Sequence, residues 1–310
     1  MKSRSIVVLK VGGDLAIHPE LIESVCNEIA NLTLAGFCVV LVHGGGPQLD
    51  QALKKRGKSS TRVAGRRVTS LSDIELAVQV WRGELSVAWV SGLGKQGISA
   101  CGVCGADGFT LQAHRRPKTA WQDDDGTLVT VDFGFVGDLD KVETSLLFSL
   151  IDAGIVPVIS PLAIDPSSGQ MLNVNADTVA SEVSSALKAD WLVLLSSIPG
   201  LLRDVRNPDS KISKLAIDEI PSLIETGVIT GGMRPKVAAL QTALESGVQR
   251  VILLDGRASQ VCKVLIEGQT AGTELYNPSS TAVSVTSVFP EMASGEHPVP
   301  RINNMTEYVG

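Results

Sequence analysis

Two lysines stand at positions where a positive charge needs an explanation. Lys10 lies inside the apolar stretch "VVLKVGG", and Lys236 lies close to the start of the helix that "GGMRPKVAAL" predicts. A buried ammonium group needs a partner or an anion, and a cation near a helix start opposes the helix dipole unless an anion binds there. Both positions therefore indicate a site for an anionic group. The alternatives are an edge strand whose lysine reaches solvent and an exposed lysine in a first helical turn.

Three glycine-rich segments accompany these lysines: "LKVGGDL", "VHGGGPQ" and "TGGMRPK". In parallel α/β sheets, ligands bind outside the carboxyl ends of the strands, where free main-chain amides attract anions. Neither GxxxxGK[ST] nor GxGxxG occurs at these loops, so the common nucleotide fingerprints do not explain them. Each segment alone is also compatible with a turn that holds no ligand. Together they favour an anionic ligand.

Polar residues of two further segments could contribute to the same site. In "NVNADTVASEV", the residues Asn173, Asn175 and Asp177 alternate, so an extended chain would present them on one face. An ordinary helix cap would explain one of these three residues. Arg67 in "RRVTS" has a planar fork that suits a carboxylate, or it is a charge on the outer face of a hairpin.

The elements that must position these residues alternate between apolar β-branched runs and helical segments. This alternation predicts an α/β fold with a mainly parallel sheet covered by helices. The expected strands are 5–11, 37–43, 154–160, 191–197 and 248–255, and the expected long helices are 19–35, 71–94, 176–189 and 233–246.

Composition excludes several classes of protein. The chain has 310 residues, of which 44% are hydrophobic, and a net charge of -6, which argues against a nucleic-acid partner. It contains no apolar run long enough to span a membrane and no signal-peptide pattern, so we expect a cytoplasmic protein without a membrane partner. The five cysteines are scattered, and we interpret the Cys101 and Cys104 pair as small buried residues rather than a redox or zinc site.

Three other segments lack the α/β pattern. The stretches 61–70 and 135–142 alternate with a two-residue period, which predicts antiparallel strands. The polar stretch 114–129 predicts a solvated loop, including its three aspartates, so we expect no metal site built from the chain's own residues. The stretch from residue 278 to residue 310 is rich in proline and serine and predicts a loosely ordered tail.

These motifs, in this order, resemble the amino acid kinase family and, within it, the acetylglutamate kinases. The matching stretches are "LKVGGDL", "VHGGGPQ" with "GRRVTS", "MLNVNADTVA", and "TGGMRPKVAAL" with "ILLDGR", and the similarity extends over roughly residues 7–275. The resemblance implies a three-layer αβα sandwich. It also implies ATP-dependent phosphorylation of the side-chain carboxylate of N-acetyl-L-glutamate, the second step of arginine biosynthesis, with Mg²⁺ bound together with ATP.

The resemblance also implies catalytic roles, one residue at a time. Lys10 and Lys236 match the two lysines that stabilise the transition state from opposite sides. Asp177 matches the aspartate that orients these lysines. Gly45 and Gly46 match the glycines whose amides meet the substrate and the transferring group. Because a carboxylate acceptor is already ionised, such a reaction needs no general base.

Binding roles follow from the same comparison. Arg67 and Asn173 match residues that hold the carboxylates of the acetylated amino acid, and Gly13 has a supporting role in the first loop on the nucleotide side. Ser196 and Ser197 stand where the family usually has Thr or Ser followed by Asp near the nucleotide, so that contact is weakened.

A second departure lies in the stretch "VWRGELSVAWVSGL". Ser86 and Val87 replace a common Asn-Lys pair there, and Trp81 and Trp89 are added. These changes concern substrate fit and subunit contacts more than phosphoryl transfer.

The expected organisation is an N-terminal lobe (1–189) that binds the acyl amino acid and dimerises, a C-terminal lobe (190–277) that binds ATP, and the tail (278–310). Arginine-inhibited relatives carry an extra amino-terminal helix, whereas here only a few residues precede the first expected strand. We therefore expect a homodimer that is insensitive to arginine. Two alternatives stay open. One is a kinase for another N-blocked acidic amino acid, such as carrier-linked aminoadipate or N-succinylglutamate, and the other is a non-catalytic ligand-binding protein on the same fold.

Overall fold

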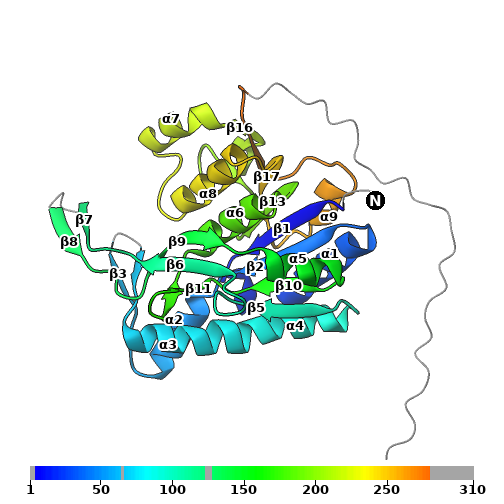
Figure 1. Cartoon of the computed structure of the whole chain (residues 1–310). Coiled ribbons are helices and arrows are strands. Elements are labelled where there is room, and N and C mark those ends of the chain that lie inside the picture. Colours follow the sequence, from blue (N-terminus) through cyan, green and yellow to red (C-terminus); the bar gives the residue numbers. More distant parts are fainter. Residues whose placement is uncertain (1–3, 64–65, 123–127, 280–310) are drawn as a thin grey trace, which may run out of the picture.

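The structure is a computed structural model that describes residues 4–63, 66–122 and 128–279. Its centre is an eight-stranded sheet (Figure 1). In spatial order the strands are β16 (Lys214–Ala216), β18 (Thr273–Tyr276), β17 (Arg250–Asp255), β13 (Trp191–Ser196), β1 (Ile6–Val11), β2 (Cys38–His43), β10 (Val156–Ile159) and β5 (Ala100–Val103). The six strands from β17 to β5 are parallel, while β18 runs antiparallel to β17. The five predicted strands are all present, and the predicted parallel sheet is confirmed.

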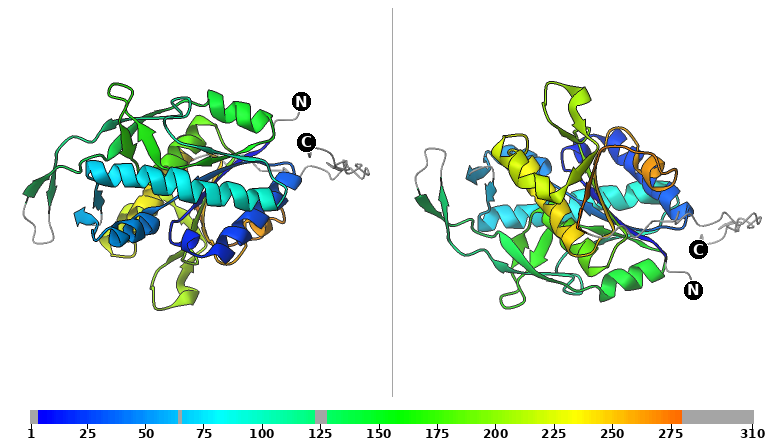
Figure 2. Two further views of the ribbon diagram at one scale, coloured as in Figure 1. Left: turned by 90° about the horizontal axis from the view of Figure 1, so that it is seen from below. Right: turned by 90° about the horizontal axis from the view of Figure 1, so that it is seen from above.

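Helices cover both faces of the sheet, which makes three layers (Figure 2). One face packs against α5 (Ser145–Asp152), α6 (Ala176–Ala186), α7 (Ile220–Glu225) and α8 (Met233–Glu245). The other face packs against α1 (Pro19–Leu34), α4 (Ser86–Lys95) and α9 (Val261–Leu265). The predicted αβα sandwich is therefore confirmed.

Side-chain alternation along β1 explains which residues meet which layer. Val7, Leu9 and Val11 belong to the core beneath α1, α4 and α9, whereas Val8 belongs to the core beneath α6 and α8. Lys10 has the same parity as Val8, so its side chain emerges on the side of α6 and α8. The strand register thus decides which helices can supply a partner for this lysine.

A smaller sheet and several hairpins decorate the core. The second sheet has the order β12 (Met171–Asn173), β11 (Leu162–Ile164), β6 (Leu111–Arg115) and β9 (Gly137–Val142). The hairpins pair β3 (Thr61–Val63) with β4 (Arg66–Val68), β7 (Thr119–Gln122) with β8 (Leu128–Val131), and β14 (Leu201–Leu202) with β15 (Lys211–Ile212). The predicted antiparallel pairing of 61–70 and of 135–142 is confirmed.

The prediction of a loop over 114–129 is wrong for most of its described residues, because they form the end of β6, the strand β7 and the start of β8. The aspartates 123–125 and residues 280–310 of the predicted tail lie outside the described residues.

A long helix borders the molecule and starts with a well-formed cap. The hydroxyl of Ser70 accepts a hydrogen bond from Asp73 N–H, and the Asp73 carboxylate accepts one from Ser70 N–H. The helix then runs as α3 (Leu71–Ala77), the π-helical turn η2 (Val78–Leu85) and α4. Sequence predicted its length but not the π-helical turn. No helix in 4–63, 66–122 or 128–279 combines the length and hydrophobicity needed to cross a bilayer.

Short helical segments complete the chain. They are α2 (Gly46–Lys55), η1 (Leu15–Ile17), η3 (Pro208–Ser210) and η4 (Ile217–Glu219). Of these, α2 matters most for the site, because it begins inside the glycine loop that follows β2.

Candidate active site

The candidate site lies where three central strands end side by side. Val11 at the end of β1 pairs with His43 of β2 and with Leu195 of β13. The loops that leave these strands therefore meet at one edge of the sheet. A Cβ on Gly13 would lie 3.0 Å from Gly45 N, so the first two glycine loops touch each other.

Lys10, Asp177 and Lys236 come together at this edge, on the face covered by α6 and α8. Lys10 Nζ lies 2.6 Å from Asp177 Oδ1, and Lys236 Nζ lies 3.3 Å from Asp177 Oδ2. Lys10 and Asp177 are both only 4% exposed, whereas the Lys236 side chain is 22% exposed. Two cations thus share one carboxylate, which leaves an excess positive charge at a buried position.

The electrostatics favour the ionised form of Asp177. Burial alone would raise the pKa of the Asp177 carboxyl, but the charges of Lys10 and Lys236 outweigh it and hold the pKa below its usual value. Burial lowers the pKa of Lys10, and Lys236 adds to that effect while Asp177 opposes it. An incoming anion would relieve the mutual repulsion of the two ammonium groups.

The residues that follow β12 behave differently from the sequence prediction. Asn175 is the N-cap of α6, and its side-chain oxygen accepts hydrogen bonds from Asp177 N–H and Thr178 N–H. Asp177 lies in the first turn of the helix, not in an extended segment with Asn173. The prediction that these three side chains share one face is therefore wrong for Asn175, which caps α6. Asp177 reaches the lysines from the first turn of α6.

The opposite side of the cluster is built around α2 and the β3–β4 hairpin. Arg67 Nη2 donates to the Gly46 carbonyl at 3.2 Å and lies 2.7 Å from Asp50 Oδ1. The Arg67 side chain is 8% exposed, and among the described residues its buried Nη1 has no hydrogen-bond partner. The guanidinium is thus held through Nη2 by Asp50 and the Gly46 carbonyl, and Nη1 can donate to a ligand such as a carboxylate.

Asn173 lies at the end of β12 and reaches the same hairpin through one contact. Its Nδ2 donates to Thr69 Oγ1 at 3.1 Å, and Thr69 directly follows β4. Asn173 therefore contacts the residue that follows the strand of Arg67, so the structure brings these two predicted substrate-binding residues near each other.

The residues expected on the nucleotide side are only loosely connected. The Gly13 carbonyl accepts a hydrogen bond from Gln48 Nε2 at 2.8 Å, so Gly13 lies close to the loop after β2. Ser196 is buried at the end of β13, and its carbonyl accepts a hydrogen bond from Gly256 N–H. Ser197 is exposed. A role of these three residues in ATP binding stays a prediction.

Two groups that sequence reasoning missed support the glycine loop. His43 is fully buried, and burial lowers its pKa to about 4, so the imidazole is neutral at physiological pH. The indole of Trp81 donates to the Gly45 carbonyl. Trp81 and Trp89 are both buried inside the chain, so neither side chain is available for a subunit contact. The sequence offered one sign of this role for Trp81, namely an unusual tryptophan in a predicted helix.

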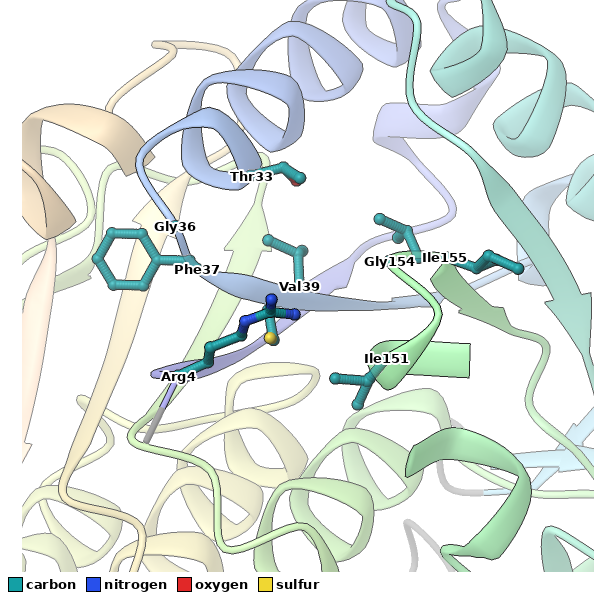
Figure 3. A pocket seen from close by; sticks show the side chains of 10 residues that line it. Arg4, Thr33, Gly36, Phe37, Val39, Ile151, Gly154 and Ile155 are labelled. Carbon is teal, nitrogen blue, oxygen red and sulfur yellow. The ribbon is translucent and has the colours of Figure 1, made fainter. Parts of the chain in front are cut away.

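A separate hollow lies at the other end of the strands (Figure 3). It has a volume of about 260 Å³ and is lined by apolar residues that include Phe37, Val39, Ile151 and Ile155. These residues precede or begin β2 and β10, whereas the lysine cluster lies where the strands end. The hollow is therefore not part of the candidate site.

Comparison with known proteins agrees with this geometry. The profile of the amino acid kinase family matches residues 5–255. The chain is 42% identical to an acetylglutamate kinase of Heliobacterium modesticaldum over 82% of its length and 86% of that protein. It is also 42% identical to an acetylglutamate kinase of Desulfitobacterium hafniense, over 86% of its length and 88% of that protein.

Solved structures show the same fold. A crystal structure of a Streptococcus mutans protein is 25% identical and superimposes with a TM-score of 0.70, covering 87% of this chain and 98% of that one. With the family match covering most of the chain and the lysine–aspartate cluster at the strand ends, the chain belongs to the amino acid kinase family.

Proposed function

We propose that the protein transfers the γ-phosphoryl group of ATP to the side-chain carboxylate of N-acetyl-L-glutamate. The products are N-acetyl-L-glutamyl 5-phosphate and ADP, which places the reaction in arginine biosynthesis. Relatives named acetylglutamate kinase that match over most of both chains support this acceptor. The observation that carries the proposal is the triad in which Lys10 and Lys236 share Asp177.

The triad suits phosphoryl transfer between two anions. The reacting groups are a carboxylate and a triphosphate, so the main barrier is charge repulsion rather than proton removal. Lys10 and Lys236 would neutralise charge on the transferring group, and Asp177 would hold both ammonium groups in place. A neutral His43 fits this scheme, because the acceptor needs no base.

The acceptor would bind on the Arg67 side of the cluster. The free Nη1 of Arg67 offers a charge-assisted hydrogen bond to a substrate carboxylate, and Asn173 offers a neutral amide beside it. The Gly45 and Gly46 amides, at the start of α2, would face the side-chain carboxylate and the arriving phosphoryl group.

ATP would bind on the side of Gly13, Ser196 and Ser197. The excess positive charge of the triad fits a triphosphate, because two ammonium groups face a single carboxylate. When bound with ATP, Mg²⁺ supplies further neutralisation of the phosphate charge.

We also propose a homodimer, for which the exposed Leu71 and Val87 on the long helix offer apolar surface. Light scattering that gives a monomer or a hexamer would contradict it.

The test is to incubate the protein with ATP, Mg²⁺ and a panel of acceptors, and to trap any acyl phosphate as a hydroxamate with hydroxylamine. We expect hydroxamate with N-acetyl-L-glutamate, formed about 100-fold or more slowly by the Lys10→Ala variant. If hydroxamate forms faster with N-succinylglutamate or a carrier-linked aminoadipate, that compound is the acceptor. No hydroxamate with any acceptor would favour a ligand-binding protein on the kinase fold.

A further inference from the structure

The indole of Trp81 lies directly on the glycine loop that follows β2. Its Nε1–H donates a 2.7 Å hydrogen bond to the Gly45 carbonyl, and Trp81 is only 3% exposed. A Cβ built on Gly45 would come within 2.3 Å of Trp81 Cδ1. Glycine is therefore required at position 45, because the indole fills the space that a side chain would need.

The bond to the Gly45 carbonyl also fixes the direction of a donor. In a trans peptide unit, the carbonyl of one residue and the N–H of the next lie in one plane and point in opposite directions. The Gly46 N–H belongs to the first turn of α2, where helical N–H groups lack an acceptor within the helix. The Gly45 carbonyl is held by Trp81 and by Leu49 N–H at 3.0 Å, so the Gly46 N–H points away from the indole. Hydrogen bonds to the carbonyl also polarise the peptide unit and strengthen its N–H as a donor.

The preceding peptide unit is supported by neighbouring buried groups. His43 Nδ1 lies 3.3 Å from the Gly44 carbonyl, and His43 Nε2 lies 3.0 Å from Ser160 Oγ. Ser160 Oγ is also 3.3 Å from the Trp81 carbonyl. Because the Gly44 carbonyl shares its peptide unit with the Gly45 N–H, this buried cluster bears on both amides of the loop.

The π-helical turn of the long helix gives Trp81 this position. Trp81 lies within η2, where the hydrogen-bond pattern includes an extra residue per turn and so shifts the side chains that follow to a new direction. Such turns are rare and are frequently found at functional sites. The contact with Gly45 is a reason for the irregularity.

We infer that Trp81 is a positioning residue for phosphoryl transfer, which aims the Gly46 N–H at the reacting groups by holding the Gly45 carbonyl. The inference rests on the proposed function, which gives the loop amides their substrate. Trp81 itself touches no reacting atom in this scheme. Its contribution is to keep a main-chain donor in the orientation that the transition state needs, where small displacements are costly.

The test compares Trp81→Phe with Trp89→Phe. Trp89 is a matched control, because it is fully buried in the same long helix and its Nε1 has no hydrogen-bond partner among the described residues. We expect Trp81→Phe to lower kcat by about tenfold or more while the acceptor KM changes by less than about threefold. Trp89→Phe should leave kcat within about twofold of the wild type. Equal kcat values for the two variants, or a loss confined to KM, would overturn the inference.

A second readout does not depend on activity. In protein labelled with ¹⁵N-glycine, the amide resonance of Gly46 should move in Trp81→Phe and stay in place in Trp89→Phe. If the wild type forms no hydroxamate with any acceptor, the proposed function fails, and this resonance alone decides the positioning inference. A Gly46 resonance that does not move in Trp81→Phe would refute it.

A third variant keeps the test possible if Trp81→Phe misfolds. If Trp81→Phe does not fold, benzothienylalanine at position 81 keeps the shape of the indole and replaces its N–H with sulfur. The same loss of kcat and the same movement of the Gly46 resonance are expected, and their absence would contradict the inference.

Discussion

The buried imidazole of His43 makes stability depend on pH in a way that can be calculated. Burial lowers the pKa of His43 from 6.5 to about 4, so the folded protein holds a neutral ring that must be charged once the chain unfolds in mild acid. The unfolded state therefore binds more protons between these two pKa values. Stability from this group is present above pH 6.5 and is lost as the pH falls toward 4.

The size of the effect follows from the two pKa values. Integrating the linkage relation gives about 2 kcal/mol of stability lost through His43 on going from pH ~7.5 to pH ~5. Carboxylates that titrate in the same range add their own dependence, so the wild type alone does not isolate this contribution. The His43→Asn variant removes it, because an amide does not titrate.

Urea unfolding followed by circular dichroism at several pH values would measure the difference. The gap in unfolding free energy between the wild type and His43→Asn should shrink by about 2 kcal/mol between pH ~7.5 and pH ~5. Ser160→Ala is the matched control, because it removes a hydrogen-bond partner of the ring and leaves the ring itself to titrate. A gap that stays constant with pH would refute a buried neutral imidazole.

Three further substitutions test the site. Lys10→Ala should lower kcat by about 100-fold or more and change the ATP KM by less than about threefold, and steady-state kinetics with an effect confined to KM would contradict a transition-state role. Asp177→Asn leaves two partly or fully buried ammonium groups without their carboxylate, so urea unfolding should show a loss of about 3 kcal/mol. An unchanged free energy of unfolding would mean that Asp177 does not stabilise the two lysines. Arg67→Lys should raise the acceptor KM by about tenfold, because an ammonium cannot hold Asp50 and a ligand carboxylate at once. An acceptor KM equal to that of the wild type would rule out that contact.

The parts of the fold that sequence predicted are those with strong local signals. A lysine inside a β-branched strand next to a glycine pair places Lys10 at a strand end, and strand parity then directs it to α6 and α8. Three-layer packing follows from alternating buried strands and amphipathic helices. The lobe boundary near residue 189 stays a prediction.

The parts that sequence did not predict depend on contacts between distant segments. Nothing in the local sequence says that Asn175 caps α6 while Asp177 turns toward the lysines, because both residues suit a helix start. The packing of Trp81 on Gly45 depends on a π-helical turn that composition does not encode. Likewise, the pairing of Arg67 with Asp50 joins a hairpin to a helix and becomes visible only in three dimensions.

The central claim is that a side-chain carboxylate oxygen of the acceptor forms the new bond to the γ-phosphorus of ATP. The most direct measurement uses N-acetyl-L-glutamate labelled with ¹⁸O in its side-chain carboxylate, with ATP, Mg²⁺ and hydroxylamine. Hydroxylamine attacks the acyl carbon, so the phosphate that leaves keeps the bridging oxygen of the acyl phosphate. Phosphorus NMR should therefore show one ¹⁸O in each released phosphate. Unlabelled phosphate would contradict phosphorylation of the carboxylate oxygen.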